Sequence, residues 1–224
     1  MIFRTREILV MQRTQLINSL RGLLEEFGVI APTGRANIEK LCEQVHEPDS
    51  PPSDNAVEVG QVMLEQINLC QDKIEHVEKK TLQAAKTDEE ARRVMTIPGV
   101  GSITAMALQA FAPDMARFEN GRHFAAWLGP VPKQKSTSGN SILGSTSKMG
   151  QRDIRRLLIS GAMALLSNRA RNGAAEGSWI ARMLASKPKK LNAVTLANKM
   201  ARMIWAVTTK RQEYRTPNLT AQTV

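Results

Sequence analysis

Aromatic residues are scarce in this 224-residue sequence, at 4% of the chain, and stretches in which Val, Ile or Thr alternate with polar residues are nearly absent. Both features argue against a β-rich fold, because strands are enriched in aromatic and β-branched side chains. Leu, Ala, Met, Glu, Lys and Arg dominate instead, and apolar residues recur at spacings of three and four. The sequence therefore predicts an all-α protein.

Cysteine clusters and long apolar runs are also missing. The two cysteines, Cys42 and Cys70, lie in no CxxC or Cys/His cluster, so neither a disulfide framework nor a zinc site is expected. The sequence has no uninterrupted apolar run of about 18 residues, the length of a membrane span. Charged residues interrupt the apolar run at the N-terminus, unlike in a signal peptide. We expect a soluble, cytoplasmic protein without a membrane partner.

Acidic residues are scarce in the second part of the chain. Residues 96–224 contain 19 Lys and Arg but only 5 Asp and Glu, a net charge of +14. Residues 1–95 contain 12 Lys and Arg and 16 Asp and Glu, a net charge of −4. This distribution indicates a polyanionic partner for the basic part, and favours nucleic acid over an anionic membrane surface.

Helical periodicity divides the chain into segments separated by Gly, Pro and polar residues. A proline-rich break at 46–55 marks one boundary, and Thr87, with Glu90 three residues later, is typical of a capping box. We expect three regions, 1–55, 56–86 and 87–224. The predicted helices cover residues 2–27, 36–47, 56–84, 88–95, 102–111, 117–128, 152–170 and 191–211, with a polar loop at 129–151.

One predicted helix, 56–84, carries an apolar seam. Its members alternate in steps of four and three, which is the pattern of a coiled coil that would join two copies of the chain. The seam covers barely three heptads, so packing of an ordinary amphipathic helix within the monomer stays equally open. The seam consists of Met63, Ile67, Cys70, Ile74 and Val77.

The stretch "IPGVGSITA", residues 97–105, interrupts two predicted helices. The pattern is that of a helix-hairpin-helix motif, in which Ile97 and Val100 would enter the core. The two glycines, Gly99 and Gly101, would allow backbone angles closed to other residues. The amides from Gly99 through Val100 and Gly101 to Ser102 would then face a DNA phosphate at the start of the second helix. A simple tight turn is the alternative.

The predicted loop 129–151 is rich in serine, threonine and lysine. Three interpretations stay open: a flexible polar linker, a loop that binds phosphates, and a site in which one serine attacks a phosphodiester. The last needs a base or a metal to activate the hydroxyl and cations to hold the phosphoryl charge. The cations of the loop are Lys133, Lys135 and Lys148.

Several motifs, in this order, resemble the Piv/MooV-type insertion-sequence transposases, the IS116/IS110/IS902 type. They are "IPGVGSITAMAL", "ARFENGRHFAAWLGPVPKQKSTSGN", "STSKMGQRDIRRLL" and "LANKMARMIWAV". The segment "FRTREILVMQRTQLINSLRGLLEEFG" is similar to the helical stretch that follows the nuclease-like domain of this family. The resemblance covers nearly the whole chain and places its helix-hairpin-helix in the C-terminal transposase domain.

The resemblance implies a recombinase for the transposition of a mobile element. In the family, an N-terminal RuvC-like domain brings four carboxylates that hold metal, a C-terminal serine becomes linked to DNA, and a bridge RNA guides the reaction. The serine falls in "KSTSGN", where Ser136 is favoured and Ser138 is the alternative. Charge and position make Lys148, Arg152 and Arg155 candidate phosphate contacts. DNA is the implied partner, with guide RNA as a further candidate.

The sequence departs from the family by lacking an early β-rich segment with aspartates at strand ends. The acids of residues 39–90 are spread along helix faces and a linker, so we predict no metal site and no cofactor here; Mg would belong to the missing RuvC-like domain. We expect a truncated transposase, a coding sequence with its start assigned too late, or a decayed copy, inactive alone. The alternatives are a non-catalytic helix-hairpin-helix DNA-binding module that dimerises through 56–84, and a structural remnant.

Overall fold

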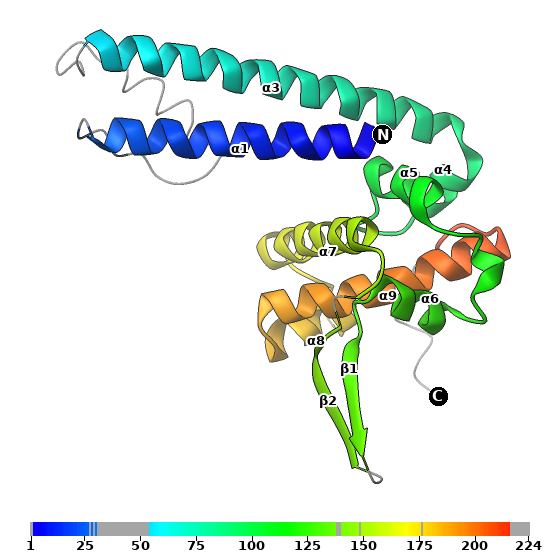
Figure 1. The fold of residues 1–224 in the computed structure, drawn as a ribbon. Helices are drawn as coiled ribbons and strands as arrows, with labels where there is room; N and C mark the ends of the chain where they lie inside the picture. The colour runs from blue at the N-terminus through cyan, green and yellow to red at the C-terminus, as the bar shows by residue number, and fades with distance from the viewer. Residues whose placement is uncertain are drawn as a thin grey trace. The chain divides into compact units, whose positions relative to one another are not determined.

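The computed structural model describes residues 2–26, 28, 30, 54–137, 140–147, 149–175 and 177–215, with the backbone alone for 54–56, 132–137, 140–143, 145 and 146. The predicted all-α fold is confirmed, with one small β-hairpin added to it (Figure 1). The elements are α1 (Ile2–Glu26), α3 (Asp54–Thr87), α4 (Glu89–Met95), α5 (Ser102–Phe111), the 3₁₀ helix η2 (Met115–Arg117), α6 (Gly121–Leu128), β1 (Pro132–Thr137), β2 (Asn140–Thr146), α7 (Arg152–Asn172), α8 (Trp179–Ser186) and α9 (Lys189–Lys210).

The chain divides into two compact units, Met1–Lys80 and Thr81–Val224, here called the N-terminal unit and the C-terminal unit. The division falls within α3. The predicted helix at 36–47 lies outside the described residues, and the boundaries predicted at 55 and 86 stay predictions.

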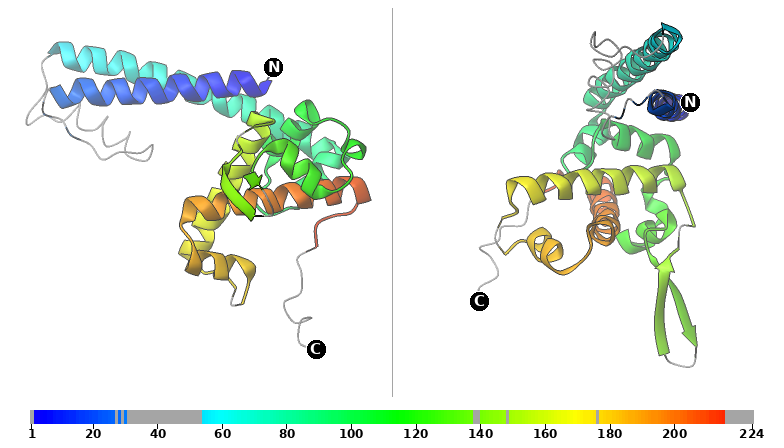
Figure 2. Two further views of the ribbon diagram at one scale, coloured as in Figure 1. Left: turned by 60° about the horizontal axis from the view of Figure 1, so that its bottom comes forward. Right: turned by 90° about the vertical axis from the view of Figure 1, so that its left-hand side faces the viewer.

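The N-terminal unit is an antiparallel pair of long helices, α1 and α3, which lie side by side in Figures 1 and 2. Its core is small, because only one face of each helix is covered. Five buried side chains form this core: Ile17, Leu20 and Leu24 of α1, and Leu64 and Ile67 of α3. Burying an aliphatic side chain of this size contributes about 1.5–3 kcal/mol.

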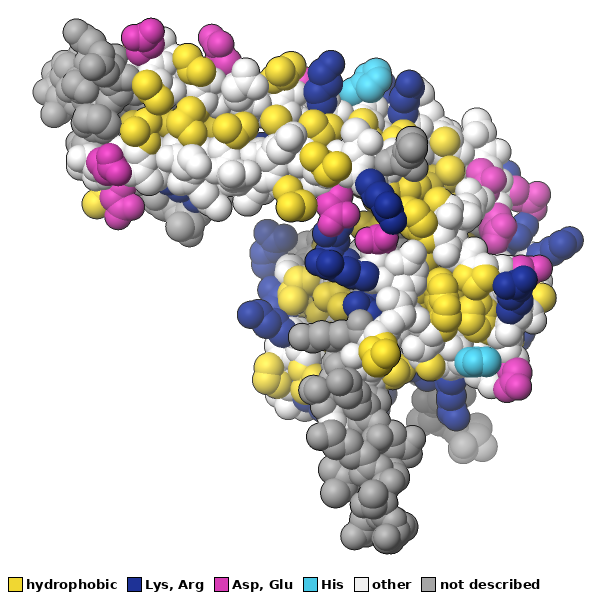
Figure 3. Space-filling view, in the orientation of Figure 1, with side chains coloured by type: hydrophobic (Ala, Val, Ile, Leu, Met, Phe, Trp, Pro, Cys, Tyr) yellow, Lys and Arg dark blue, Asp and Glu magenta, His cyan; other side chains and the backbone are white. Residues whose placement is uncertain are grey.

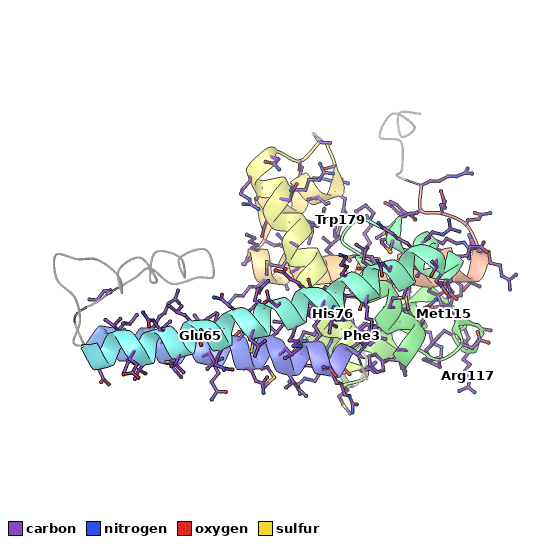
Figure 4. All side chains as sticks on the ribbon, turned by 90° about the horizontal axis from the view of Figure 1, so that it is seen from above. Phe3, Glu65, His76, Met115, Arg117 and Trp179 are labelled. Carbon is purple, nitrogen blue, oxygen red and sulfur yellow. The ribbon has the colours of Figure 1, made fainter. Side chains whose placement is uncertain are left out.

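Polar pairs extend the contact between the two helices in a regular register. Arg6 Nε donates to Glu78 Oε1 at 2.7 Å, and Arg13 Nη1 donates to Gln71 Oε1 at 2.5 Å. The two pairs are separated by seven residues on each helix, which is the heptad spacing. Outside this contact α3 exposes Glu65 (Figure 4), and it also exposes the apolar side chains of Val59, Val62 and Leu69.

Part of the apolar face of α3, at Leu64 and Ile67, packs against α1 of the same chain, as the monomer alternative predicts. Within the predicted seam, Ile67 and Ile74 are buried, whereas Met63, Cys70 and Val77 are half-buried. Association of two copies through residues 56–84 stays a prediction.

The junction between α3 and α4 corrects the predicted helix cap by one residue. Asp88, not Thr87, is the N-cap of α4, because its Oδ1 accepts from the Ala91 amide at 2.7 Å. Thr87 instead ends α3, where its hydroxyl donates to the Ala84 carbonyl at 2.9 Å. A carboxylate at this position also faces the positive end of the helix, which stabilises the cap.

The C-terminal unit holds a single large core of 23 buried residues. Helix α9 contacts α4, η2, α6, α7 and α8, so it forms the centre of this unit. The side chains that α6, α7 and α9 bury most completely include Phe124, Leu128, Ile154, Leu158, Leu166, Met200 and Ile204.

Three segments of this unit differ from the predicted ones. The helix expected at 117–128 begins at Gly121, because Asn120 Oδ1 accepts from the amides of Arg122 and His123, both at 3.0 Å. Helix α8 was not predicted, although Ser178 caps it through a bond from the Ala181 amide. The segment expected as a polar loop contains β1 and β2, which extend away from the helices of this unit (Figure 2).

Candidate nucleic-acid interface

The turn between α4 and α5, Pro98–Gly101, is a short hydrogen-bonded bend, called the PGVG turn below. The Val100 amide donates to the Ile97 carbonyl at 3.0 Å, and the Ile97 amide donates to the Val94 carbonyl at 3.1 Å. The side chains of Ile97 and Val100 are 1% and 6% exposed and belong to the core. The prediction that these two residues enter the core is confirmed.

Gly99 allows the backbone of the turn to approach the backbone of α7. Its φ is +86°, a left-handed conformation that side chains disfavour. A Cβ on Gly99 would lie 3.2 Å from the Gly161 carbonyl oxygen, and a Cβ on Gly161 would lie 2.0 Å from the Gly99 oxygen. The turn therefore rests directly on the middle of α7, which fixes its position in the C-terminal unit.

Gly101 does not need the backbone freedom that the sequence suggested. Its φ of −97° and ψ of 177° are extended values that any residue adopts, and a Cβ there would meet no atom within 4 Å. The prediction of special angles is right for Gly99 and wrong for Gly101. Gly101 is instead the N-cap of α5, a position that glycine tolerates well.

The start of α5 carries amide donors without an acceptor in the helix. The first bond of the helix runs from the Ala105 amide to the Gly101 carbonyl at 3.0 Å, and no side chain caps the N-terminus. The amides from Ser102 to Thr104 are therefore not bonded to earlier carbonyls of α5. Gly101 is exposed and Ser102 is half-buried, so the positive end of α5 is reachable from solvent.

The segment with the candidate nucleophile is an antiparallel hairpin of β1 and β2, called the serine hairpin below. Ser136 is the last residue but one of β1 (Pro132–Thr137), and it pairs with Ser141 of β2. Ser138 and Lys148 lie outside the described residues, and so do the side chains of Ser136, Lys133 and Lys135. The assignment of the nucleophile accordingly stays a prediction.

Two glycines hold the ends of the serine hairpin together by close backbone contact. A Cβ on Gly129 would lie 1.8 Å from the Met149 carbonyl oxygen, and a Cβ on Gly150 would lie 1.9 Å from the Trp127 carbonyl oxygen. Both have positive φ, +84° and +101°. The Ser147 amide adds a bond to the Val131 carbonyl at 2.8 Å. The base of the hairpin is therefore a fixed junction.

Arg155 of α7 stabilises this junction by hydrogen bonds to two backbone carbonyls. Its Nη1 donates to the Leu128 carbonyl at 3.0 Å and to the Met149 carbonyl at 3.1 Å. On the other side, Asn198 Nδ2 of α9 donates to the Pro130 carbonyl at 3.1 Å. Arg152, at the start of α7, is exposed. Phosphate contacts by Arg152 and Arg155 stay predictions, but Arg155 has a structural contact that charge and position did not reveal.

Basic side chains gather over α7 on the face shown in Figure 3. A further cation, Lys199 of α9, lies with its Nζ 4.4 Å from the ring centroid of Trp179 at the start of α8 (Figure 4). Burial, together with the neighbouring positive charge of Arg202, lowers the pKa of Lys199 from its ordinary value. The electron-rich face of the indole offsets part of this cost.

A groove of about 740 Å³ lies at the ends of α4 and α5 opposite to the PGVG turn. Met115 lines it (Figure 4). Its walls carry three carboxylates, those of Asp88, Glu90 and Asp114, and two guanidinium groups, those of Arg93 and Arg211. This mixed lining favours an anionic ligand less than the uncapped start of α5 does.

The described residues contain no group of three or more His, Cys, Asp or Glu side chains placed to hold a metal ion. Among the helices of the described ranges, none combines the length and the hydropathy that crossing a membrane requires.

Comparisons with known proteins point to one family. Residues 91–176 match the model of the Transposase IS116/IS110/IS902 family. These residues run from α4 through the PGVG turn and the serine hairpin to the end of α7. The curated relatives described in the next paragraph are all named as transposases, which agrees with this family model. This supports the IS116/IS110/IS902 transposase family.

Three curated relatives carry transposase names. The chain is 38% identical over 216 residues to the "Probable family 20 transposase" of Pseudomonas aeruginosa, which covers 95% of this chain and 63% of that protein. It is 33% identical to the transposase for insertion sequence element IS1328 of Yersinia enterocolitica, over 93% of this chain and 62% of that one. It is 32% identical to the transposase for insertion sequence element IS1111A of Coxiella burnetii, over 96% of this chain and 59% of that protein. The chain thus spans about three fifths of the length of these relatives.

Sequence reasoning missed three groups of residues in this part of the molecule. Gly161 could not be identified, because a glycine inside a helical pattern does not show which backbone segment packs against it or how closely. Asn198 and the structural contact of Arg155 depend on folding and could not be read from the chain. The run Lys187-Pro188-Lys189-Lys190 could have been found, because basic residues around a proline mark an exposed helix start.

Proposed function

We propose that this chain is the nucleic-acid-binding part of a DNA transposase of an insertion sequence. The uncapped start of α5, held beside a turn whose backbone rests on α7, is the observation that carries the proposal. The net charge of residues 96–224 and the names of the curated relatives add support.

In this proposal the PGVG turn acts as a helix-hairpin-helix contact. The free amides after Gly101 donate to a phosphate oxygen of DNA, and the positive end of α5 adds to the attraction. Such contacts fix the position of the protein on DNA without reading its sequence. The Gly99–Gly161 contact keeps the donors in place, so little conformational freedom is lost on binding.

The serine hairpin carries the proposed chemistry. The Oγ of Ser136, or of Ser138 as the alternative, attacks a phosphodiester. An Oγ–P bond forms, a P–O bond of the DNA breaks, and the serine proton passes by way of a base to the DNA oxygen, which leaves as a hydroxyl. The lysines of this segment, Lys133, Lys135 and Lys148, with Arg152 and Arg155 of α7, would hold the phosphoryl charge. The rigid base of the hairpin supports this role, because a nucleophile has to be held in position to react.

Strand transfer would require the RuvC-like carboxylate domain of the family and the Mg it holds, which the donor sets described above do not supply. We therefore propose DNA binding for this chain and no strand transfer without that domain. A guide RNA is a second proposed partner.

The DNA contact can be tested by one charge placed at the start of α5. Ser102→Asp puts an anion on the first residue of the helix, where it stabilises the helix but repels a phosphate. We expect the affinity of the chain for a 30-base-pair duplex to fall about tenfold, the loss of one charge-assisted contact. The measurement is fluorescence anisotropy over a salt series.

The matched control is Ser19→Asp, the same charge change on an exposed position of α1. An equal loss of affinity in both variants would show that net charge alone is responsible. An affinity without salt dependence would also contradict the phosphate contact, because each neutralised phosphate adds about −0.9 to the log–log slope on duplex DNA.

The nucleophile can be tested separately in a protein that also carries the carboxylate domain. Ser136→Ala is expected to abolish the covalent protein–DNA adduct on a denaturing gel, while Ser138→Ala retains it. The serine assignment is wrong if both variants still form the adduct.

A non-catalytic DNA-binding module is the second candidate. It is favoured by the separate core of 23 buried residues in the C-terminal unit, which lets this unit hold the turn without help from another domain. DNA binding that depends on Ser102, without any adduct in the protein that carries the carboxylate domain, would select it.

A further inference from the structure

A second basic surface lies at the end of the C-terminal unit where α7 ends, α8 runs and α9 begins. Helix α8 contacts both α7 and α9, so these three segments meet at one end of the unit. Six exposed cations stand there, called the basic end: Arg169, Arg171, Arg182, Lys187, Lys189 and Lys190. None of them was a predicted site residue.

The corner that presents the three lysines of the basic end is rigidly built. Asn192 is 1% exposed, and its Nδ2 donates to the Met183 carbonyl at 2.8 Å and to the Lys187 carbonyl at 2.9 Å. These two bonds join the end of α8 to the first turn of α9 across Pro188. The lysines therefore extend from a fixed backbone rather than from a loose loop.

Lys189 and Lys190 occupy the unfavourable end of their helix. They are the first two residues of α9, where the helix dipole is positive and acidic residues are preferred. The first turn contains no acidic residue, and no side chain caps the N-terminus. Two cations beside free amides lower the stability of α9 while concentrating positive charge at one point, an arrangement suited to binding an anion.

Carboxylates do not neutralise this charge within the described part of the chain. The ion pairs found there, Arg6–Glu78 and Arg93–Glu89, involve none of the six cations of the basic end. We propose that the basic end binds the phosphodiester backbone of a nucleic acid, as a contact surface separate from the PGVG turn. The proposal rests on the proposed function in that the partner is a nucleic acid.

The two surfaces are spaced along α7. The PGVG turn rests on Gly161, and Arg169 lies eight residues farther along the helix. At about 1.5 Å per residue this places Arg169, the nearest cation of the basic end along α7, roughly 12 Å beyond the turn contact along the axis. Because the two surfaces consist of different residues, separate substitutions measure the contribution of each surface to binding.

The test is the double variant Lys189→Glu/Lys190→Glu in the full chain. It removes two cations, and it places acidic residues where the helix dipole favours them, so the melting temperature should not fall. We expect the affinity at 0.15 M salt to decrease about thirtyfold and the log–log salt slope on duplex DNA to become shallower by about 1.8, the effect of two lost phosphate contacts.

The matched control is Lys79→Glu/Lys80→Glu, which makes the same charge change at two exposed positions of α3. An equal decrease in both double variants would overturn the proposal, because only net charge would then matter. Unchanged binding in Lys189→Glu/Lys190→Glu would overturn it as well.

The two sources of the phosphodiester backbone are separated by parallel titrations with duplex DNA and with duplex RNA of the same length. A loss confined to one titration assigns the basic end to that nucleic acid, and a loss in both assigns it to either backbone. Binding of phosphatidylserine vesicles that the double variant abolishes, with both nucleic-acid titrations unchanged, would overturn the proposal. A loss of affinity in Lys189→Glu/Lys190→Glu but not in Ser102→Asp would support the basic end and reject the contact at the PGVG turn. A loss of affinity in Ser102→Asp but not in Lys189→Glu/Lys190→Glu would reject the basic end alone.

Discussion

The two units of the chain bury their apolar side chains in different ways. The N-terminal unit covers one face of each of two helices with five buried residues, whereas the C-terminal unit encloses a core of 23. Their charges differ too: residues 1–80 contain 9 Lys and Arg against 13 Asp and Glu, and residues 81–224 contain 22 against 8. The basic unit is therefore also the one with enough core to fix backbone groups in place.

This comparison explains where the candidate contacts lie. Amide donors at the PGVG turn, the base of the serine hairpin and the corner beside Asn192 all depend on backbone held by neighbouring helices. Two helices packed along one face cannot hold a turn in this way, because little surrounds their outer sides. The first two predictions below set a change in one unit against a change in the other, and the last two each test one unit by itself.

The largest difference is expected for truncations of fully buried leucines. Leu158→Ala in the C-terminal unit should lower the free energy of unfolding of that unit by about 4 kcal/mol, because the enclosed core cannot close the cavity. Leu20→Ala should cost about 2 kcal/mol in the N-terminal unit, where two helices can shift together. A chemical denaturation series, with hydrogen exchange as the readout for each unit, gives both values. Equal costs would contradict the contrast between the two cores.

Glycine replacements should have opposite signs in the two units. Gly161→Ala places a Cβ 2.0 Å from the Gly99 oxygen and should destabilise the C-terminal unit by about 1–3 kcal/mol. Gly22→Ala in α1 meets no atom within 4 Å and should stabilise the N-terminal unit by about 0.5–1 kcal/mol. Thermal melts of the two variants check the signs. A neutral Gly161→Ala would mean that the turn does not rest on α7.

Arg155→Ala should loosen the base of the serine hairpin. It removes the donor shared by the Leu128 and Met149 carbonyls, a loss of about 1.5–3 kcal/mol for bonds from a charged group. The Ser147 amide, bonded to the Val131 carbonyl, should then exchange with solvent faster. Arg152→Ala is the control, since Arg152 is exposed and should leave this amide protected. Unchanged exchange of the Ser147 amide in Arg155→Ala would show that the bonds from Arg155 do not hold the base of the serine hairpin.

The smallest effect is expected for the polar pairs that join α1 and α3 in the N-terminal unit. Glu78→Gln removes the partner of Arg6 and should cost about 0.2–1 kcal/mol at low salt, because both side chains are partly exposed. The cost should shrink at high salt, which an unfolding series in NaCl would show. Glu65→Gln, on the outer face of α3, should change nothing measurable. A cost that does not respond to salt would contradict an ion pair.

Local signals in the sequence predicted much of the fold. The helix at 102–111 was predicted with the bounds that the structure has, because the glycine before it and the apolar spacing within it are both local. The burial of Ile97 and Val100 followed from the same pattern. The serine hairpin was not predicted, because β1 reads Pro-Lys-Gln-Lys-Ser-Thr and has no apolar alternation.

The site was predictable only in part, for a physical reason. Residue types and charge marked the PGVG turn and the serine segment, but close contacts between distant backbones decide how these segments are held. Gly99 and Gly161 are 62 positions apart in sequence and nearly touch, which no local pattern records. The same holds for Asn198 at the hairpin base.

Hydrogen exchange of the chain with and without a 30-base-pair duplex tests the central claim most directly, because it reads both units at once. The account predicts slower exchange on binding at the first amides of α5, Ser102 to Thr104, which have no helical acceptor in the free chain, and at the first turn of α9. It predicts no change in α1. Protection of α1 with unchanged exchange at the start of α5 would contradict it.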